Sequence, residues 1–312
     1  MINRRHIRIK VMQNVYAFMQ SKNDDIKRQE SYLYLGINKL YELYIIQTNL
    51  LISIQKFVKK RLEISKTNRV SKNINEQGFT NIINNKLLEK FSGNFDFNEF
   101  TQNKNLNIWK DKSEYVQLLW EEILESEYFG KYNENANPTF KDDKNFIVDV
   151  FKRIIAPNEK LIDFYESEHI GWVDDLPFVN TQIVKDINRL KEHSTFVLDT
   201  IYKDEDDREF VRKLFTKTVL HFTDYDADID ELTPNWEFDR IAQIDLILIK
   251  LGIAELLFFP SIPTKVTINE YIELSKDYSS DKSSTFINGI LDKLSKKYTK
   301  EEKIKKIGRG LL

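Results

Sequence analysis

The sequence predicts an all-α protein, and three observations support this fold class. Apolar residues recur mainly at helical spacing along the chain. Glycine and proline are few, at nine and six of 312 residues, so long uninterrupted helices can form. Hydrophobic residues make up 41% of the chain and aromatic residues 12%. This is enough apolar material for a sizeable core, divided over one large domain or two ordinary ones, and it excludes wholesale disorder.

The N-terminal part of the chain contains two strongly periodic segments. A first helix is expected over 7–22, apolar on so wide a face that it must be central to a bundle. A second is expected over 28–66, where apolar residues follow alternating steps of four and three. Packing within a bundle explains this second pattern, and an intermolecular coiled coil is the less favoured alternative. The Asn-, Lys- and Ser-rich segment 67–110 predicts loops around a short helix near 80–91.

Helical periodicity returns after residue 110. A helix is expected over 111–128, and 130–138 is expected to be a linker. The remaining predicted helices cover 143–156, 158–169, 178–201, 206–223, 237–259, 264–279 and 283–298. Pro260 and Pro263 predict a tight turn between two of them. The most apolar stretch, 244–259, contains three charged residues, which indicates a buried bundle helix and not a membrane span.

Both ends of the chain are basic and the middle is acidic. Residues 1–22 carry +5 with no acidic residue, and residues 293–309 carry +6. Because the whole chain carries −2, the remainder carries −13. A basic terminus is either a solvated tail or a binding surface for an acidic partner. Positive charge at the start of a helix also opposes the helix dipole, which favours an anionic partner at residues 4–10.

Signatures of catalysis, metal binding and export are missing from the sequence. Cysteine is absent, which excludes disulfides, thiolate metal sites and cysteine nucleophiles and suits a cytoplasmic protein. There is no phosphate-binding loop and no dinucleotide fingerprint. The four histidines lack metal-ligand spacing, and paired carboxylates lie beside loop signals, where capping explains them. We therefore expect no enzyme, cofactor, metal site, signal peptide or transmembrane helix.

An internal similarity occurs at an offset of 64 residues. The segment "FIVDVF" (146–151) aligns with "FVRKLF" (210–215). Without a gap, the alignment also pairs Ile155 with Val219, Trp172 with Trp236, and Asp175 with Asp239. Helical periodicity alone produces many such matches, so a degenerate duplication at 143–175 is a hypothesis.

Two regions together resemble the NusB family of transcription antitermination factors. They are "RRHIRIKVMQNVYAFMQ" (4–20) and the segment from Asn235 to Leu294. The most specific pieces are "PTKVTINEYIELSK" (263–276) and "SSTFINGILDKL" (283–294). The resemblance covers a little over a third of the chain. It implies an all-α bundle without catalysis, which binds a boxA-like single-stranded RNA together with the small-subunit ribosomal protein NusE. The complex would act on RNA polymerase in transcription antitermination or termination and support rRNA transcription.

The resemblance also implies which residues of this chain bind RNA and protein. On the N-terminal side the RNA-binding residues would be Arg4, Arg5, Arg8, Gln13 and Tyr16. On the C-terminal side, beside the first group, they would be Tyr278, Asp281, Lys282, Ser283 and Phe286. The partner-binding residues would be Asp245 and Glu255. A homodimer that hides the RNA site is left open.

Elementary chemistry agrees with these roles. Arginine binds phosphate through bidentate hydrogen bonds, and aromatic side chains stack on unpaired bases. The start of the last helix offers backbone N–H groups to a phosphate. For Tyr16 and Phe286 burial in the core is an equal alternative, and Ser283 also suits an N-cap.

The sequence departs from the compact family pattern in two ways. Lys282 stands where compact relatives commonly have an acidic residue, which should strengthen RNA binding. A helical insertion over 24–200 separates the two parts of the bundle, 1–22 and 201–300, and a basic tail follows at 301–312. The acidic, Trp- and Tyr-rich insertion is better suited to binding protein than RNA. Two alternative functions are an RNA-modifying enzyme subunit and an adaptor acting through the insertion.

Overall fold

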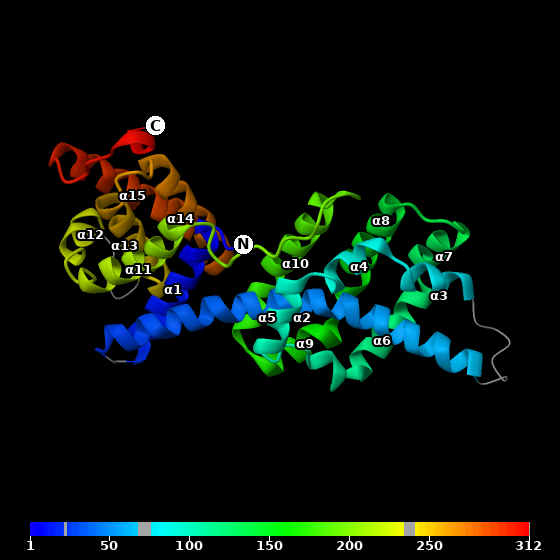
Figure 1. The fold of residues 1–312 in the computed structure, drawn as a ribbon. Coiled ribbons are helices and arrows are strands. Elements are labelled where there is room, and N and C mark those ends of the chain that lie inside the picture. Colours follow the sequence, from blue (N-terminus) through cyan, green and yellow to red (C-terminus); the bar gives the residue numbers. More distant parts are fainter. Residues whose placement is uncertain (22–23, 68–75, 234–240, 312) are drawn as a thin grey trace. The chain divides into compact units, whose positions relative to one another are not determined.

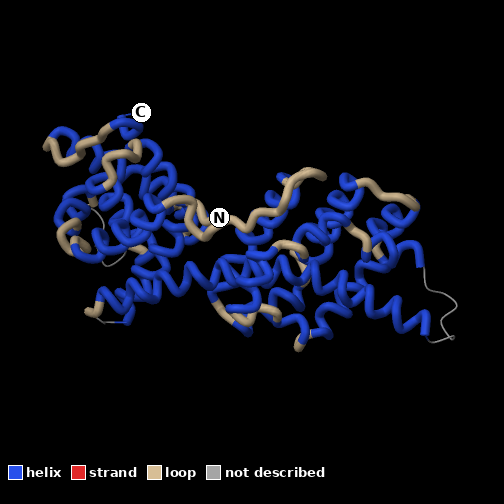
Figure 2. Tube along the Cα trace, in the orientation of Figure 1, coloured by secondary structure: helices blue, strands red, loops and turns tan. Residues whose placement is uncertain are grey.

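The structure is a computed structural model that describes residues 1–21, 24–67, 76–233 and 241–311. The described residues form helices joined by loops and turns and contain no strand (Figure 2). The all-α prediction is confirmed. Contacts within the chain define two compact units. Unit 1 comprises Met1–Ile37 and Thr200–Leu312, and unit 2 comprises Asn38–Asp199.

Unit 1 is a bundle of helices from both ends of the chain (Figure 1). Its helices are α1 (Arg4–Ser21), the first part of α2 (Ile26–Thr67), α11 (Glu205–Leu220), α12 (Asp226–Leu232), α13 (Gln243–Phe258), α14 (Thr264–Tyr278) and α15 (Ser283–Lys300). A 3-10 turn follows at Gly308–Leu311. Apart from α12, these helices lie where the sequence predicts helix. The first residues of the helix predicted at 237–259 lie outside the described residues.

Helix α13 is the centre of unit 1. It is buried almost all round, as its apolar sequence requires. The buried ammonium of Lys250 forms an ion pair of 2.5 Å with Asp226 and lies 3.7 Å from the centre of the Phe222 ring. The helix ends before Pro260, and α14 begins directly after Pro263. The predicted tight turn is therefore confirmed.

Unit 2 contains the remainder of α2 and all helices up to residue 189. They are α3 (Glu76–Ile83), α4 (Lys86–Ser92), α5 (Phe95–Asn103), α6 (Ser113–Glu125), α7 (Glu127–Glu134), α8 (Phe140–Val150), α9 (Glu159–Glu168) and α10 (Gly171–Arg189). A 3-10 turn lies at Ile108–Lys110, and a π-helical turn at Phe151–Ile155 continues α8.

The apolar stripe of α2 is buried within the chain itself. The indole N–H groups of Trp109 and Trp172 donate to α2 carbonyl oxygens at 2.8 Å each. Gln47, the polar residue in the stripe, is buried, accepts a hydrogen bond from Tyr165 and donates one to Asn180. Packing within a bundle is therefore confirmed as the explanation of the pattern.

Three boundary predictions in unit 2 are wrong for identifiable reasons. The segment 67–110 holds three helices, because Asn85 and Asn94 cap helices with their side chains where a loop was expected. The linker predicted at 130–138 is helical up to Glu134. The helix predicted at 178–201 begins earlier and ends at residue 189. Beyond it, side chains of α4 and the residue before α5 hold the backbone in a non-helical path, for example Lys90 Nζ on the carbonyl of residue 194 at 2.7 Å.

The two segments of the internal similarity are both helical. Their paired phenylalanines at 146, 151, 210 and 215 are all buried. Burial in a helical core explains such a match without duplication. Trp236 and Asp239 lie outside the described residues, so the duplication stays a hypothesis.

Candidate nucleic-acid interface

The arginines at the start of α1 face carboxylates from three other helices. Arg4 Nε donates to Asp207 on α11 at 2.8 Å, with its guanidinium 5.1 Å from the Phe210 ring. Arg5 donates through Nε and Nη2 to both oxygens of Glu270 on α14, at 3.0 Å each. The hydrogen bonds with Glu270 raise the pKa of Arg5.

Arg8 is a buried structural residue. Its side chain is 3% exposed and makes a bidentate ion pair with the fully buried Glu255, at 2.7 and 2.8 Å. Thr267 and Tyr271 also donate to this carboxylate, at 2.8 and 3.1 Å. Burial by itself would lower the pKa of Arg8, but the adjacent Glu255 raises it above its usual value.

These contacts change two of the sequence expectations. Arg8 was expected to bind RNA and Glu255 to bind a protein partner, but as folded both side chains are in the bundle interior, paired with each other. The positive charge at the start of α1 is balanced by Asp207, Glu255 and Glu270, so no external anion is needed to offset the helix dipole. The sequence reasoning missed all three roles. A glutamate among leucines and isoleucines, as at 255, is the available signal for a buried ion pair.

The outward face of α1 contains the accessible residues of the predicted N-terminal group. Arg5, Gln13 and Tyr16 share this face with Ile9 and Gln20, because the spacings of three and four residues follow the helical turn. The Arg5 side chain is 46% exposed and Tyr16 is 38% exposed. Gln13 is half-buried. We call Arg5, Gln13 and Tyr16 the α1 stripe.

The C-terminal group lies around the turn between α14 and α15. Asp281 and Lys282 are exposed in the turn, and Tyr278 and Phe286 are half-buried on either side of it. Ser283 is buried, and its hydroxyl donates to Asp245 on α13 at 2.7 Å. It is the first residue of α15, so its side chain ties the helix to α13 and does not act as the N-cap.

The start of α15 keeps backbone donors free. The N–H groups of Ser284 and Thr285 make no hydrogen bond to the described part of the chain, and the N-cap position, Lys282, offers no capping acceptor. The first turn contains no acidic residue. Two free N–H groups, the positive end of the helix dipole and the exposed Lys282 together suit a phosphate group.

Hydrogen bonds fix how the two predicted groups are arranged. Gln20 at the end of α1 bonds to Gln243, and Ser283 bonds to Asp245, so both contacts are at the start of α13. Arg5, by contrast, is tied to Glu270 in the middle of α14. Helices α1 and α14 therefore run in the same direction. Eight residues further along each helix, about 12 Å, Gln13 and Tyr278 reach the same level.

The predicted residues thus form a strip and not one compact patch. Gln13 and Tyr16 lie at the same end of the bundle as the turn between α14 and α15. The arginines were expected beside that turn but lie about two helical turns away. Arg4, which is half-exposed, faces α11 from the side of the strip.

Asp245 has a distinctive environment at the same end. It is 6% exposed, one oxygen accepts the Ser283 hydroxyl, and the other, Oδ1, has no hydrogen-bond partner in the described part of the chain. A buried carboxylate oxygen without a donor is costly. A donor from a bound partner would satisfy it.

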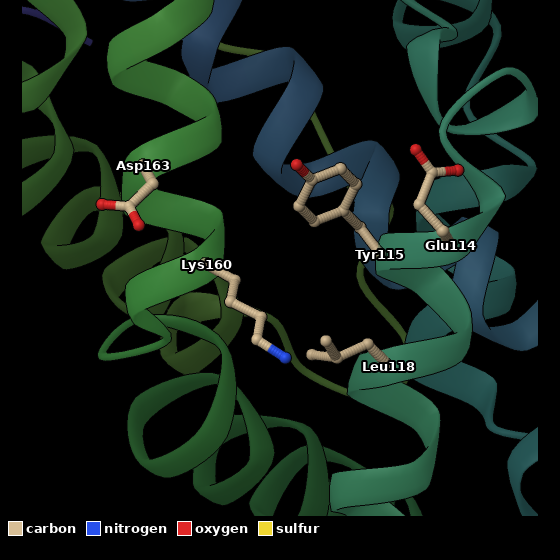
Figure 3. A pocket seen from close by; sticks show the side chains of 5 residues that line it. All are labelled: Glu114, Tyr115, Leu118, Lys160 and Asp163. Atoms are coloured by element: carbon tan, nitrogen blue, oxygen red, sulfur yellow. The ribbon is translucent and has the colours of Figure 1, made fainter.

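Unit 2 has a shallow hollow of about 330 Å³ between α6 and α9 (Figure 3). It is lined by Glu114, Tyr115, Leu118, Lys160 and Asp163. The Lys160 amine extends from α9 towards Leu118, whereas the Asp163 carboxylate points away. The hollow therefore presents a single ammonium group beside apolar atoms. Among the described residues, no group of His, Asp or Glu side chains is placed to hold a metal ion, and no helix is both long and apolar enough to cross a membrane.

Comparisons with known proteins bear on unit 1 above all. The profile of the NusB family matches residues 178–296, from α10 into α15. The chain is similar to transcription antitermination proteins NusB from three bacteria. It is 41% identical to that of Chloroherpeton thalassium over 34% of this chain and 50% of the relative. The identity to the Natranaerobius thermophilus protein is 39% over 30% of this chain and 66% of the relative.

The Salinibacter ruber protein is matched over the largest share of a relative's length among these three. It is 37% identical over 39% of this chain and 77% of its own length. The chain thus spans between half and about two thirds of the first two relatives and over three quarters of the third. No solved structure matches the chain. The all-α bundle of unit 1, together with these similarities, shows that the chain belongs to the NusB family.

Proposed function

We propose that this protein is a non-catalytic, RNA-binding transcription antitermination factor. Its RNA is a boxA-like single strand, bound together with a small-subunit ribosomal protein of the NusE type. The complex acts on RNA polymerase and supports rRNA transcription. The relatives' name, transcription antitermination protein, supports this proposal, and the observation that carries it is the exposed α1 stripe beside the turn between α14 and α15.

The strip offers the three kinds of contact that a single strand needs. Arg5 presents a partly exposed guanidinium that can bind a phosphate at its free edge. Tyr16 presents an aromatic ring, and stacking of a base on such a ring contributes about 1–3 kcal/mol. Lys282 and the free N–H groups of α15 supply an anion site at the far end. Spacing of about 12 Å between the arginine and aromatic ends suits an extended strand better than a compact ligand.

The protein partner is proposed to bind at the start of α13. There the unpaired Oδ1 of Asp245 can accept a hydrogen bond from the partner. Glu255, ten residues further along α13, is excluded from this surface by its pairing with Arg8. The proposed partner contact therefore rests on Asp245 alone among the two residues predicted from the sequence.

The proposal is tested by fluorescence anisotropy titrations of the full chain with a boxA-like RNA. The test variant is Arg5→Gln with Tyr16→Ala, and the matched control is Arg28→Gln with Tyr32→Ala, an exposed pair on α2. We expect the test variant to weaken binding at least 10-fold, because it removes a phosphate contact and a stacked base. The control should bind like the natural protein. Equal affinity of the test and control variants would refute the proposed surface.

A further inference from the structure

The last turns of α2 carry a row of exposed lysines. Lys56, Lys59, Lys60 and Lys66 all project into solvent. Their spacing places them within about a third of the helix circumference. We call these four residues the lysine face. They span ten residues, or about 15 Å of helix axis. Figure 1 shows this end of α2, in light blue, beyond α6 at the edge of unit 2.

The opposite side of these turns is fixed within unit 2. Val58 and Leu62 are buried there. The Gln55 amide donates to the carbonyl oxygens of Ile82 and Ile83 on α3, at 3.3 and 2.9 Å. Because one side of α2 is held in the bundle, the lysine face has a fixed orientation towards solvent.

The positive charge of the lysine face is not balanced in the way the arginines of α1 are. None of the four lysines forms an ion pair or hydrogen bond with another side chain in the described part of the chain. Glu63 lies among them on the same side and has an interaction of its own. Arg61, next to the face, stacks over Phe57 at 5.4 Å and adds a fifth positive charge. A net positive surface results on a unit that is otherwise acidic.

The chemistry of this surface suits a phosphate backbone. Lysine is a point charge without the planar fork of arginine, so it attracts phosphates without reading bases. Protein–protein interfaces are depleted in lysine and enriched in aromatic residues, and the lysine face contains no aromatic residue. A helix that lies on a membrane turns a broad apolar side to the lipid. Here the apolar side, with Val58 and Leu62, is buried in unit 2.

We propose that the lysine face is a second, sequence-independent contact for RNA, so that the insertion extends the length of RNA that the protein holds. The choice of RNA as the occupant rests on the function proposed for unit 1. This inference replaces the sequence-based expectation that the insertion binds protein rather than RNA.

The test compares salt-dependent binding of the full chain to a long single-stranded RNA and to a short RNA that holds only the boxA-like element. The test variant changes Lys56, Lys59, Lys60 and Lys66 to Gln. The matched control changes four other exposed lysines of unit 2 to Gln, namely Lys104, Lys110, Lys141 and Lys152. Loss of four phosphate contacts should reduce the slope of log K against log salt by about 2.8, and affinity at 0.1 M salt by roughly 5-fold per contact. The short RNA should bind the test variant unchanged.

Further arms separate the outcomes. A variant with arginine at the same four positions keeps the charge and should keep the affinity, and thermal unfolding shows whether the Gln variant is folded. If test and control variants have the same slope on the long RNA, the inference is wrong. It is also wrong if phosphatidylserine vesicles bind the natural protein more tightly than the RNA does. Failure of the proposed function would appear separately, as unchanged binding after Arg5→Gln with Tyr16→Ala.

Discussion

Replacement of Arg8 by Met tests whether this arginine serves the fold or the RNA. The variant removes the guanidinium and leaves Glu255 in a fully buried site. The carboxylate then keeps two hydroxyl donors, Thr267 and Tyr271, in place of a bidentate ion pair. Removing one partner of a buried pair costs about 3–5 kcal/mol, because the other charge is left uncompensated. We expect a loss of this size in the free energy of unfolding of unit 1.

The matched control is Arg5→Met. Arg5 makes a similar bidentate pair, but it is 46% exposed and its partner Glu270 is 20% exposed. An ion pair accessible to water contributes at most about 1 kcal/mol. The measurement is urea unfolding followed by circular dichroism. The double variant Arg8→Met with Glu255→Met should recover much of the lost stability, which a double-mutant cycle reports as coupling.

RNA titrations of the same variants complete this test. Arg8→Met should keep its RNA affinity at temperatures where it is folded, and Arg5→Met should lose affinity. The reasoning would be refuted if Arg8→Met cost less than about 1 kcal/mol and abolished RNA binding. Arg8 would then be an RNA ligand, as the sequence suggested.

Three further predictions concern other parts of the chain. Lys282→Glu should lower RNA affinity with an unchanged melting temperature, because Lys282 is exposed at the start of α15; a lower melting temperature would give it a structural role. Burial alone would raise the pKa of Asp228, but hydrogen bonds from Lys297 and Tyr298 outweigh this and lower it below 3.8. The unfolded state therefore binds more protons just below pH 3.8, and this stabilisation is lost as the pH falls. Asp228→Asn should cost about 1 kcal/mol at neutral pH, and the difference from the natural protein should shrink in acid; a constant difference would contradict the shift. Replacing 38–199 by a short linker should leave a folded unit 1 that binds boxA-like RNA, and loss of that binding would place the site in the insertion.

The helices themselves were largely predictable, because strong apolar periodicity survives in the folded chain. The α2 pattern was interpreted correctly, and its stripe is buried as the spacing requires. The errors lie where polar residues have two local uses. Asparagine is typical of loops and of helix caps alike, and Asn85 and Asn94 cap helices in a segment predicted to be mostly loop.

The site was less predictable, because charge pairing is decided in three dimensions. Arg8 and Glu255 are 247 residues apart in sequence, and no local pattern joins them. Counting charges at the N-terminus suggested an unbalanced basic segment, whereas the fold supplies a carboxylate for each of three arginines. The lysines at the end of α2 were visible in the sequence. Their meaning required knowing that Val58 and Leu62 bury the other side of the helix.

The most direct test of the RNA-binding surface is ultraviolet cross-linking of boxA-like RNA to the full chain, with the linked peptides identified by mass spectrometry. Aromatic rings stacked on bases are well placed for such cross-linking. We expect linked peptides that contain Tyr16, Tyr278 or Phe286, all from the α1 stripe and the turn between α14 and α15. Cross-links confined to peptides within 38–199 would contradict the proposed surface and place the boxA-like RNA on the insertion.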